Sequence, residues 1–144
     1  MDPNLWADLW PKAHGATTHF PIALALMAVL AEVAAFVGAE RPVARTLHAV
    51  GYWTILLGAV GSVGAVVSGL LMTKGSVLGH DTLRRHHLFV WPAFALLVGL
   101  ATWRVLIGGR ASRGAMGVYL LGLAAMAGLM AAAGYYGAEM MIAR

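Results

Sequence analysis

Four long stretches of almost uninterrupted apolar residues dominate this 144-residue chain. They cover residues 20–38, 48–72, 88–107 and 115–138, and each is close to the roughly 20 apolar residues that a helix needs to cross a bilayer. A helix satisfies its backbone hydrogen bonds within one lipid-exposed segment. The sequence therefore predicts an all-α fold: one transmembrane domain, residues 1–144, built as a four-helix transmembrane bundle.

The composition supports a membrane protein. Hydrophobic residues make up 60% of the chain and charged residues 11%, whereas a soluble domain carries about 25% charged residues. The net charge is +4, and the Lys and Arg residues sit at the ends of the apolar stretches, where they anchor helices at lipid headgroups. We therefore expect membrane lipids as partners and no nucleic acid.

The N-terminal segment predicts a short helix lying in the membrane interface. Asp2 and Pro3 are typical of a helix start, and Trp6 and Trp10 are spaced by about one helical turn. Pro11 is expected to end this helix before the first span begins. Tryptophan favours the headgroup region, which makes an interfacial position the natural interpretation.

An even number of spans puts both chain ends on one face of the membrane, together with the connection at residues 73–87. We call this face the terminal side, and the other face, with connections at residues 39–45 and 108–114, the opposite side. Basic residues are divided equally between the faces, so orientation stays open. The terminal side has Lys12, Lys74, Arg84, Arg85 and Arg144, and the opposite side has Arg41, Arg45, Arg104, Arg110 and Arg113.

Histidines gather near the terminal side. Neutral imidazole is a common ligand of haem iron, zinc and copper. Two helices, each offering one histidine at matched depth, would hold a b-type haem without covalent attachment, and the chain has no cysteine for a c-type link. Alternatively, these side chains only bind headgroups, water or loop carbonyls. The histidines concerned are His14, His19, His80, His86 and His87.

A second group of polar residues falls near the opposite side. Glu32 and Arg104 both lie deep in their spans, near the level of Arg45 and His48. We expect an ion pair between Glu32 and Arg104 or Arg45, since an isolated charge in a bilayer is costly. A carboxylate on a proton path or at a quinone site is the functional alternative. Glu32 and His19 fall on opposite faces of their helix, so they are not expected to share a site.

Small residues are frequent in the second and fourth apolar stretches, where they predict close helix packing or room for a flat cofactor. No hydrolase motif is present: the chain has no Gly-x-Ser-x-Gly, no His-Glu-x-x-His and no phosphate-binding glycine loop. The sequence therefore gives no support to a membrane hydrolase, and whether the protein is an enzyme stays open.

The segment from His14 to Leu24 resembles the His-x-x-x-x-His-Phe-Pro-Ile-Ala-Leu opening of a bacterial four-helix membrane family, domain of unknown function 2231. The Ser68-Gly69, Arg85-His86-His87 and Gly134-x-x-Gly137-Ala138-Glu139 segments are also similar to its pattern. The resemblance implies a bacterial inner-membrane protein organised like small membrane-bound b-type cytochromes. On that analogy His19 and either His86 or His87 would be the axial ligands.

These observations predict a protein that binds haem b and transfers electrons between the quinone pool and a partner redox subunit. His19, His87, His86 and Arg85 are the predicted cofactor-binding residues, with Arg85 available to pair with haem propionates or lipid phosphates. Two alternatives remain. One is a non-catalytic subunit that assembles a larger membrane complex through its glycine-rich helices. The other is a metal-binding protein using His14, His19, His86 and His87.

Overall fold

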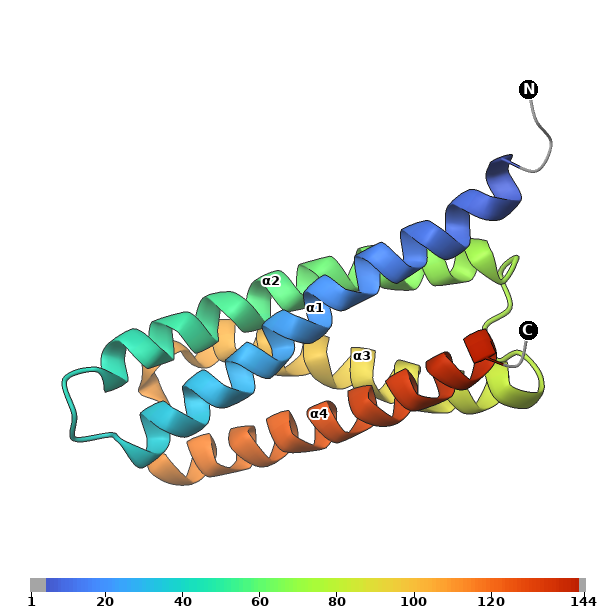
Figure 1. Ribbon diagram of the computed structural model, residues 1–144. Coiled ribbons are helices and arrows are strands. Elements are labelled where there is room, and N and C mark those ends of the chain that lie inside the picture. Colours follow the sequence, from blue (N-terminus) through green and yellow to red (C-terminus); the bar gives the residue numbers. More distant parts are fainter. Residues whose placement is uncertain (1–4, 143–144) are drawn as a thin grey trace.

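The computed structural model describes residues 5–142 and shows four long helices (Figure 1). A single 3-10 turn, Gly108–Arg110, separates the last two helices. Each long helix contains a segment that is long and apolar enough to cross a membrane. The predicted all-α, four-helix transmembrane bundle is therefore confirmed. The helices are α1 Leu5–Val37, α2 Ala44–Met72, α3 Asp81–Ile107 and α4 Arg113–Ile142.

The helices extend beyond the apolar stretches that predicted them. The second and third stretches end at Met72 and Ile107, where α2 and α3 also end, but all four helices begin earlier than their stretches. Only the part of a helix inside lipid needs apolar side chains, so the helical backbone continues into polar flanks. The predicted helix start at Asp2 and Pro3 and the basic residue Arg144 lie outside the described residues.

The predicted separate N-terminal helix is wrong in one respect. Pro11 lies inside α1, and the segment expected to form its own helix is the beginning of a continuous helix that runs to Val37. Proline removes one backbone hydrogen bond and clashes with the preceding turn, which bends a helix without necessarily ending it. Membrane helices tolerate proline for this reason. His14 therefore lies within α1, well past the start of the helix.

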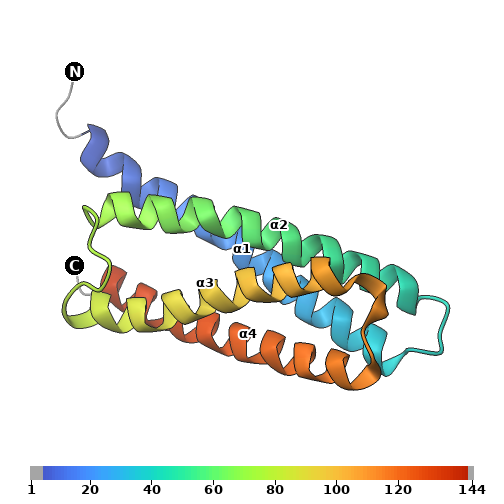
Figure 2. The same cartoon turned by 180° about the vertical axis from the view of Figure 1, so that it is seen from behind.

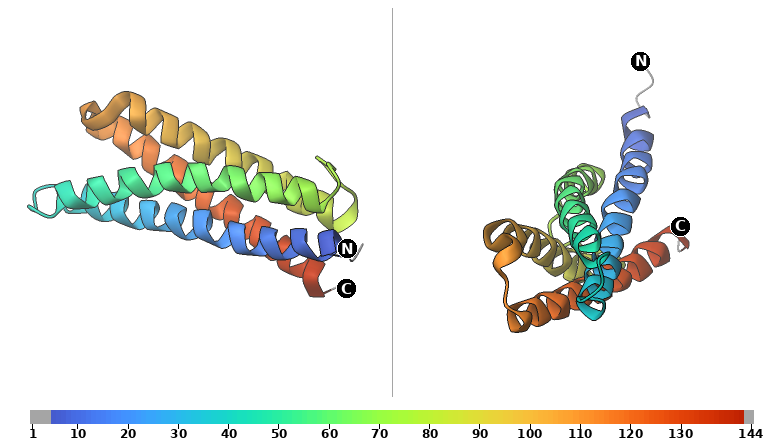
Figure 3. Two further views of the ribbon diagram at one scale, coloured as in Figure 1. Left: turned by 90° about the horizontal axis from the view of Figure 1, so that it is seen from above. Right: turned by 90° about the vertical axis from the view of Figure 1, so that its left-hand side faces the viewer.

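The bundle consists of two helical hairpins. α1 packs mainly on α2, and α3 mainly on α4, with fewer contacts between the hairpins. Figure 2 shows the same pairing from behind. The two chain ends lie at the same end of the bundle, as an even number of spans requires (Figure 1). α1 and α4 separate toward that end, which Figure 1 and the right-hand view of Figure 3 both show.

The apolar core occupies the part of the bundle nearer the opposite side. Ala25 and Ala28 of α1, Ile55 of α2 and Leu97 of α3 are fully buried there, against several residues of α4. Large apolar side chains elsewhere face outward on every helix, as helices surrounded by lipid tails require. The core therefore fixes the hairpins together at one end and leaves the terminal side, where the histidines lie, less tightly packed.

The fold predicts that a water-soluble reagent reaches the two ends of the bundle from different sides of the membrane. Because the chain lacks cysteine, a single cysteine can be introduced by Lys74→Cys in the α2–α3 connection or by Arg110→Cys between α3 and α4. A membrane-impermeant thiol reagent applied to spheroplasts should label one variant and label the other only after permeabilisation. Labelling of both variants from the same side would contradict a four-span bundle.

Candidate functional site

His14 is held between α1 and α2 by its own ring nitrogen. Its Nδ1–H donates to the carbonyl oxygen of Ala65 at 3.0 Å and lies 3.2 Å from Oγ of Ser68. Ser68 Oγ is also 2.9 Å from Oγ1 of Thr17, one turn further along α1. A carbonyl oxygen only accepts, so this bond fixes the proton on Nδ1 of the neutral ring and leaves Nε2 as the atom with a lone pair.

His86 is held in the same way between α3 and α4. Its Nδ1–H donates to the carbonyl oxygen of Ala133 at 2.8 Å. Each ring also lies against a glycine four residues after the carbonyl that it binds. A methyl group added at Gly69 would lie 3.0 Å from the His14 ring, and one added at Gly137 would lie 3.5 Å from the His86 ring.

These matching contacts reveal an internal equivalence of the two hairpins. Positions 72 residues apart in α1 and α3 match: His14 corresponds to His86, and Glu32 corresponds to Arg104. In α2 and α4 the residues whose carbonyl oxygens accept these bonds, Ala65 and Ala133, are 68 positions apart. Gly69 and Gly137 have the same separation. The two hairpins thus present one imidazole each, by the same local construction. Repeats of this kind, with equal topology, are common in membrane proteins.

The two imidazoles lie at the same end of the bundle, His14 held against α2 and His86 held against α4. Among the side chains that the structure describes, neither Nε2 atom has a hydrogen-bond partner. The terminal side therefore has two rings whose Nδ1 atoms are anchored and whose Nε2 atoms remain available to a ligand.

His87 takes a different position from its neighbour. Its side chain is 7% exposed and faces the α2–α3 connection, with its ring 6.1 Å from that of Trp91. The indole nitrogen of Trp91 donates to the carbonyl of Val77 at 2.7 Å. The backbone of Val77 and Leu78 is also close to the His87 ring, yet its buried Nδ1 has no hydrogen-bond partner among the described residues.

The structure separates the predicted site residues into two groups. His14, His86 and His87 come together, whereas His19 and Arg85 are exposed. His19 is five positions after His14, a rotation of about 140° at ~100° per residue. On one continuous helix the two rings therefore cannot both face the interior of the bundle. The sequence signal that favours His14 is its separation of 72 positions from His86, which equals that of Glu32 from Arg104.

The predicted ion pair of the opposite side is confirmed. Nε of Arg104 donates to Oε1 of Glu32 at 3.0 Å, and Nη2 lies 2.8 Å from the same oxygen. Glu32 is 0% exposed and Arg104 is 5% exposed. The remaining carboxylate oxygen, Oε2, accepts from Nδ1–H of His48 at 2.6 Å. We call Glu32, His48 and Arg104 the opposite-side cluster.

The opposite-side cluster depends on space provided by its neighbours. A methyl group added at Gly51 would lie 2.6 Å from Cγ of Glu32, so only glycine leaves room for this carboxylate. Arg104 lies over the ring of Tyr119, 5.9 Å from its centroid, and that ring stacks on Trp103 at 4.9 Å. The Tyr119 hydroxyl is buried without a partner among the described residues.

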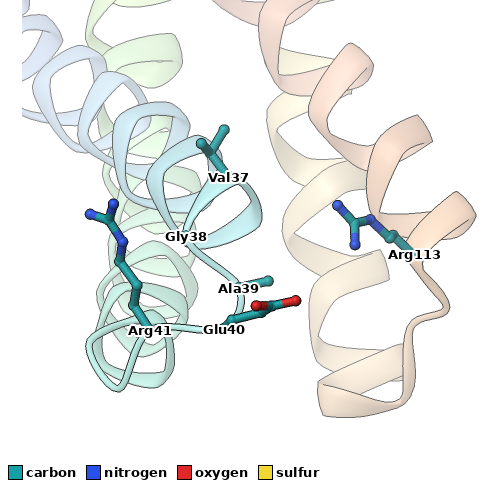
Figure 4. A pocket seen from close by; sticks show the side chains of 6 residues that line it. All are labelled: Val37, Gly38, Ala39, Glu40, Arg41 and Arg113. Atoms are coloured by element: carbon teal, nitrogen blue, oxygen red, sulfur yellow. The ribbon is translucent and has the colours of Figure 1, made fainter.

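A surface hollow on the opposite side is lined by charged residues and includes none of the histidine pair or the opposite-side cluster. Glu40 and Arg113 face it from the α1–α2 connection and from the start of α4, while Arg41 points away from Arg113 (Figure 4). The guanidinium of Arg113 lies 5.2 Å from the ring centroid of Phe36. These exposed charges at a helix end suit contact with lipid headgroups.

Comparison with known proteins places the chain in a family. A family model described as a predicted membrane protein, DUF2231, matches residues 12–143. The chain belongs to this family. No curated protein and no solved structure matches it. The matched region of this DUF2231 protein contains both the histidine pair and the opposite-side cluster. Among the side chains that the structure describes, no group of three or more His, Asp or Glu residues is arranged to hold a metal ion.

Removal of one partner of the buried ion pair should destabilise this DUF2231 protein strongly. Glu32→Ala leaves the Arg104 guanidinium buried without its carboxylate, a change that typically costs about 3–5 kcal/mol. The double variant Glu32→Leu/Arg104→Leu should lose less, because neither charge then remains. Thermal unfolding in detergent measures both. Equal losses in the single and double variants would contradict a compensated buried pair.

Glycine 51 offers a second stability test with a matched control. Gly51→Ala should lower the free energy of unfolding by about 1–3 kcal/mol, because the carboxylate that its methyl group would meet is fixed by two partners. Gly64→Ala on the same helix has open space around the added methyl group, and alanine is the better helix former. The control should therefore be neutral or slightly stabilising in the same assay.

Proposed function

We propose that this protein binds a b-type haem between its two hairpins, with His14 and His86 as the axial ligands, and transfers electrons within a bacterial inner membrane. The observation that supports the proposal most is the pair of anchored imidazoles at the terminal side. They come from matching positions of α1 and α3, at the same end of the bundle. A bis-histidine haem needs one such ligand from each of two helices.

The chemistry of the donor atoms fits a metal-bound porphyrin. Histidines that bind a metal usually donate their second ring N–H to a carbonyl or carboxylate, which orients the ring and makes it a better ligand. Ala65 and Ala133 provide this carbonyl for His14 and His86. Gly69 and Gly137 let the rings approach their neighbouring helices closely. His19, which is exposed, is replaced by His14 in this proposal.

The haem would supply the one-electron chemistry, and the chain's own residues would bind and orient it. His87 lies next to His86 and contributes a buried, unpartnered nitrogen among the described residues, available to a polar group of a ligand. The apolar outer faces of all four helices keep the site within lipid and exclude water. The quinone pool and a partner redox subunit are the proposed electron donor and acceptor.

A visible spectrum of the purified protein tests this proposal. The wild-type protein should show reduced-minus-oxidised haem bands and yield non-covalent haem on extraction. His14→Ala and His86→Ala should each reduce haem content by at least about tenfold, since loss even of a group that only orients a metal-binding histidine typically costs about 10–100-fold in metal affinity. His19→Ala is the matched control on the same helix and should retain the bands.

The proposal fails if the wild-type protein is colourless after expression with adequate haem supply. Stoichiometric zinc or copper in such a preparation, lost in His14→Ala, would instead support the metal-binding alternative. A haem spectrum that disappears in His19→Ala and survives in His14→Ala would restore the ligand predicted from the sequence.

A second candidate function is assembly of a larger membrane complex. Outward-facing small residues of α4 favour it: Gly128 and Gly134 have open space where a side chain would be, and both are exposed. Small residues let a partner helix approach closely in lipid. If partner subunits co-purify, Gly128→Leu should release them while the histidine variants leave them bound.

A further inference from the structure

The opposite-side cluster has no part in holding the proposed haem. It combines a buried ion pair with a histidine whose outer nitrogen is accessible. Glu32 is fully buried, and Arg104 donates its Nε–H to one carboxylate oxygen and holds Nη2 2.8 Å from the same oxygen. Arg104 also donates from Nη1 to the carbonyl of Gly108 at 2.9 Å. The carboxylate and the guanidinium therefore compensate each other, and the second carboxylate oxygen is left for His48.

The bond between His48 and Glu32 determines which nitrogen of His48 faces away from the cluster. An ionised carboxylate only accepts hydrogen bonds, so the 2.6 Å contact places a proton on Nδ1 of His48. In the neutral ring Nε2 is then a hydrogen-bond acceptor. A carboxylate behind an imidazole also orients that ring and makes it a stronger acceptor.

The outer nitrogen of His48 is accessible. The side chain is 34% exposed, in contrast to its buried partners, and Nε2 has no hydrogen-bond partner among the side chains that the structure describes. Tyr52 follows one turn later on the same face of α2. The Tyr52 ring meets that of Trp53 edge to face at 5.4 Å, so an aromatic pair follows His48 along α2.

We propose that His48, oriented by Glu32, binds the hydroxyl group of a membrane-soluble quinol at this end of the bundle. The hydroxyl would donate to Nε2, and the neighbouring aromatic side chains would pack against the quinol ring. A lipid hydroxyl could also donate to Nε2, but the adjacent aromatic rings favour an aromatic ligand. The choice of a quinol rests on the proposed electron-transfer function, whereas the acceptor site rests on the geometry of His48 and Glu32 alone.

Equilibrium binding of a short-chain benzoquinol and of its oxidised benzoquinone tests this site. The protein is reconstituted in quinone-free lipid nanodiscs, and the measurement is made in the His14→Ala background so that no redox exchange with a haem intervenes. The quinol should bind about three- to tenfold more tightly than the quinone, because the quinone lacks the O–H donor and one hydrogen bond is lost. His48→Phe should abolish this preference.

Two controls make the result decisive. His19→Phe alters an exposed histidine outside the cluster and should preserve the preference for the quinol. His48→Phe leaves Oε2 of the buried Glu32 without its partner, so its thermal midpoint should fall, but by less than that of Glu32→Ala, because Glu32 keeps its contacts with Arg104. Binding is therefore compared at a temperature at which both proteins are folded. Equal binding of quinol and quinone by the parent, or an unchanged preference in His48→Phe, would overturn the proposal. Since haem is absent from this assay, a failed haem assignment does not alter its outcome.

Discussion

The buried pair of Glu32 and Arg104 is the constraint on which the arrangement of the bundle depends. Each charge would be very costly alone inside a bilayer, and together they oblige α1 and α3 to meet at one depth. That contact joins the two hairpins, which otherwise pack mainly within themselves. The fully buried apolar residues gather at the same end, so the charged pair and the core act together.

This constraint has a consequence at the other end of the molecule. His14 precedes Glu32 by the same number of residues as His86 precedes Arg104. The ion pair between Glu32 and Arg104 therefore also sets His14 and His86 at matching levels in the bundle. α1 and α4 separate toward the terminal side, as the right-hand view of Figure 3 shows, and the buried apolar cluster lies nearer the other end. A rigid, paired end and a more open end with two anchored imidazoles suit a molecule that holds a ligand between its hairpins.

The sequence predicted the fold well because apolar run length is a direct requirement of the bilayer. It also predicted the ion pair of Glu32 with Arg104, since a charge deep in a span requires a partner. The sequence offered His14 only for a metal site and preferred His19 for haem, because the first span was expected to begin near Phe20, whereas α1 is continuous from Leu5 to Val37. The rotation of α1 about its own axis against α2 decides whether His14 or His19 faces the interior of the bundle. The length of the apolar stretch does not determine that rotation.

Other features could be identified only from tertiary contacts. The bond between His48 and Glu32 depends on how α2 rotates against α1, and the space that admits the carboxylate is visible only once Gly51 is seen beside it. Likewise, the choice between His86 and His87 depends on which ring reaches the carbonyl of Ala133. The equal spacing of the paired residues in the two hairpins was present in the sequence, but it acquired meaning from these contacts.

We propose that two imidazoles, anchored through Nδ1 and offered by matching positions of α1 and α3, bind one iron. Low-temperature electron paramagnetic resonance of the oxidised, purified protein tests this proposal. We expect a low-spin ferric signal typical of two imidazole ligands, converted to a high-spin signal or lost when either His14 or His86 is replaced. A high-spin signal in the wild-type protein, or a low-spin signal that survives both replacements, would contradict it.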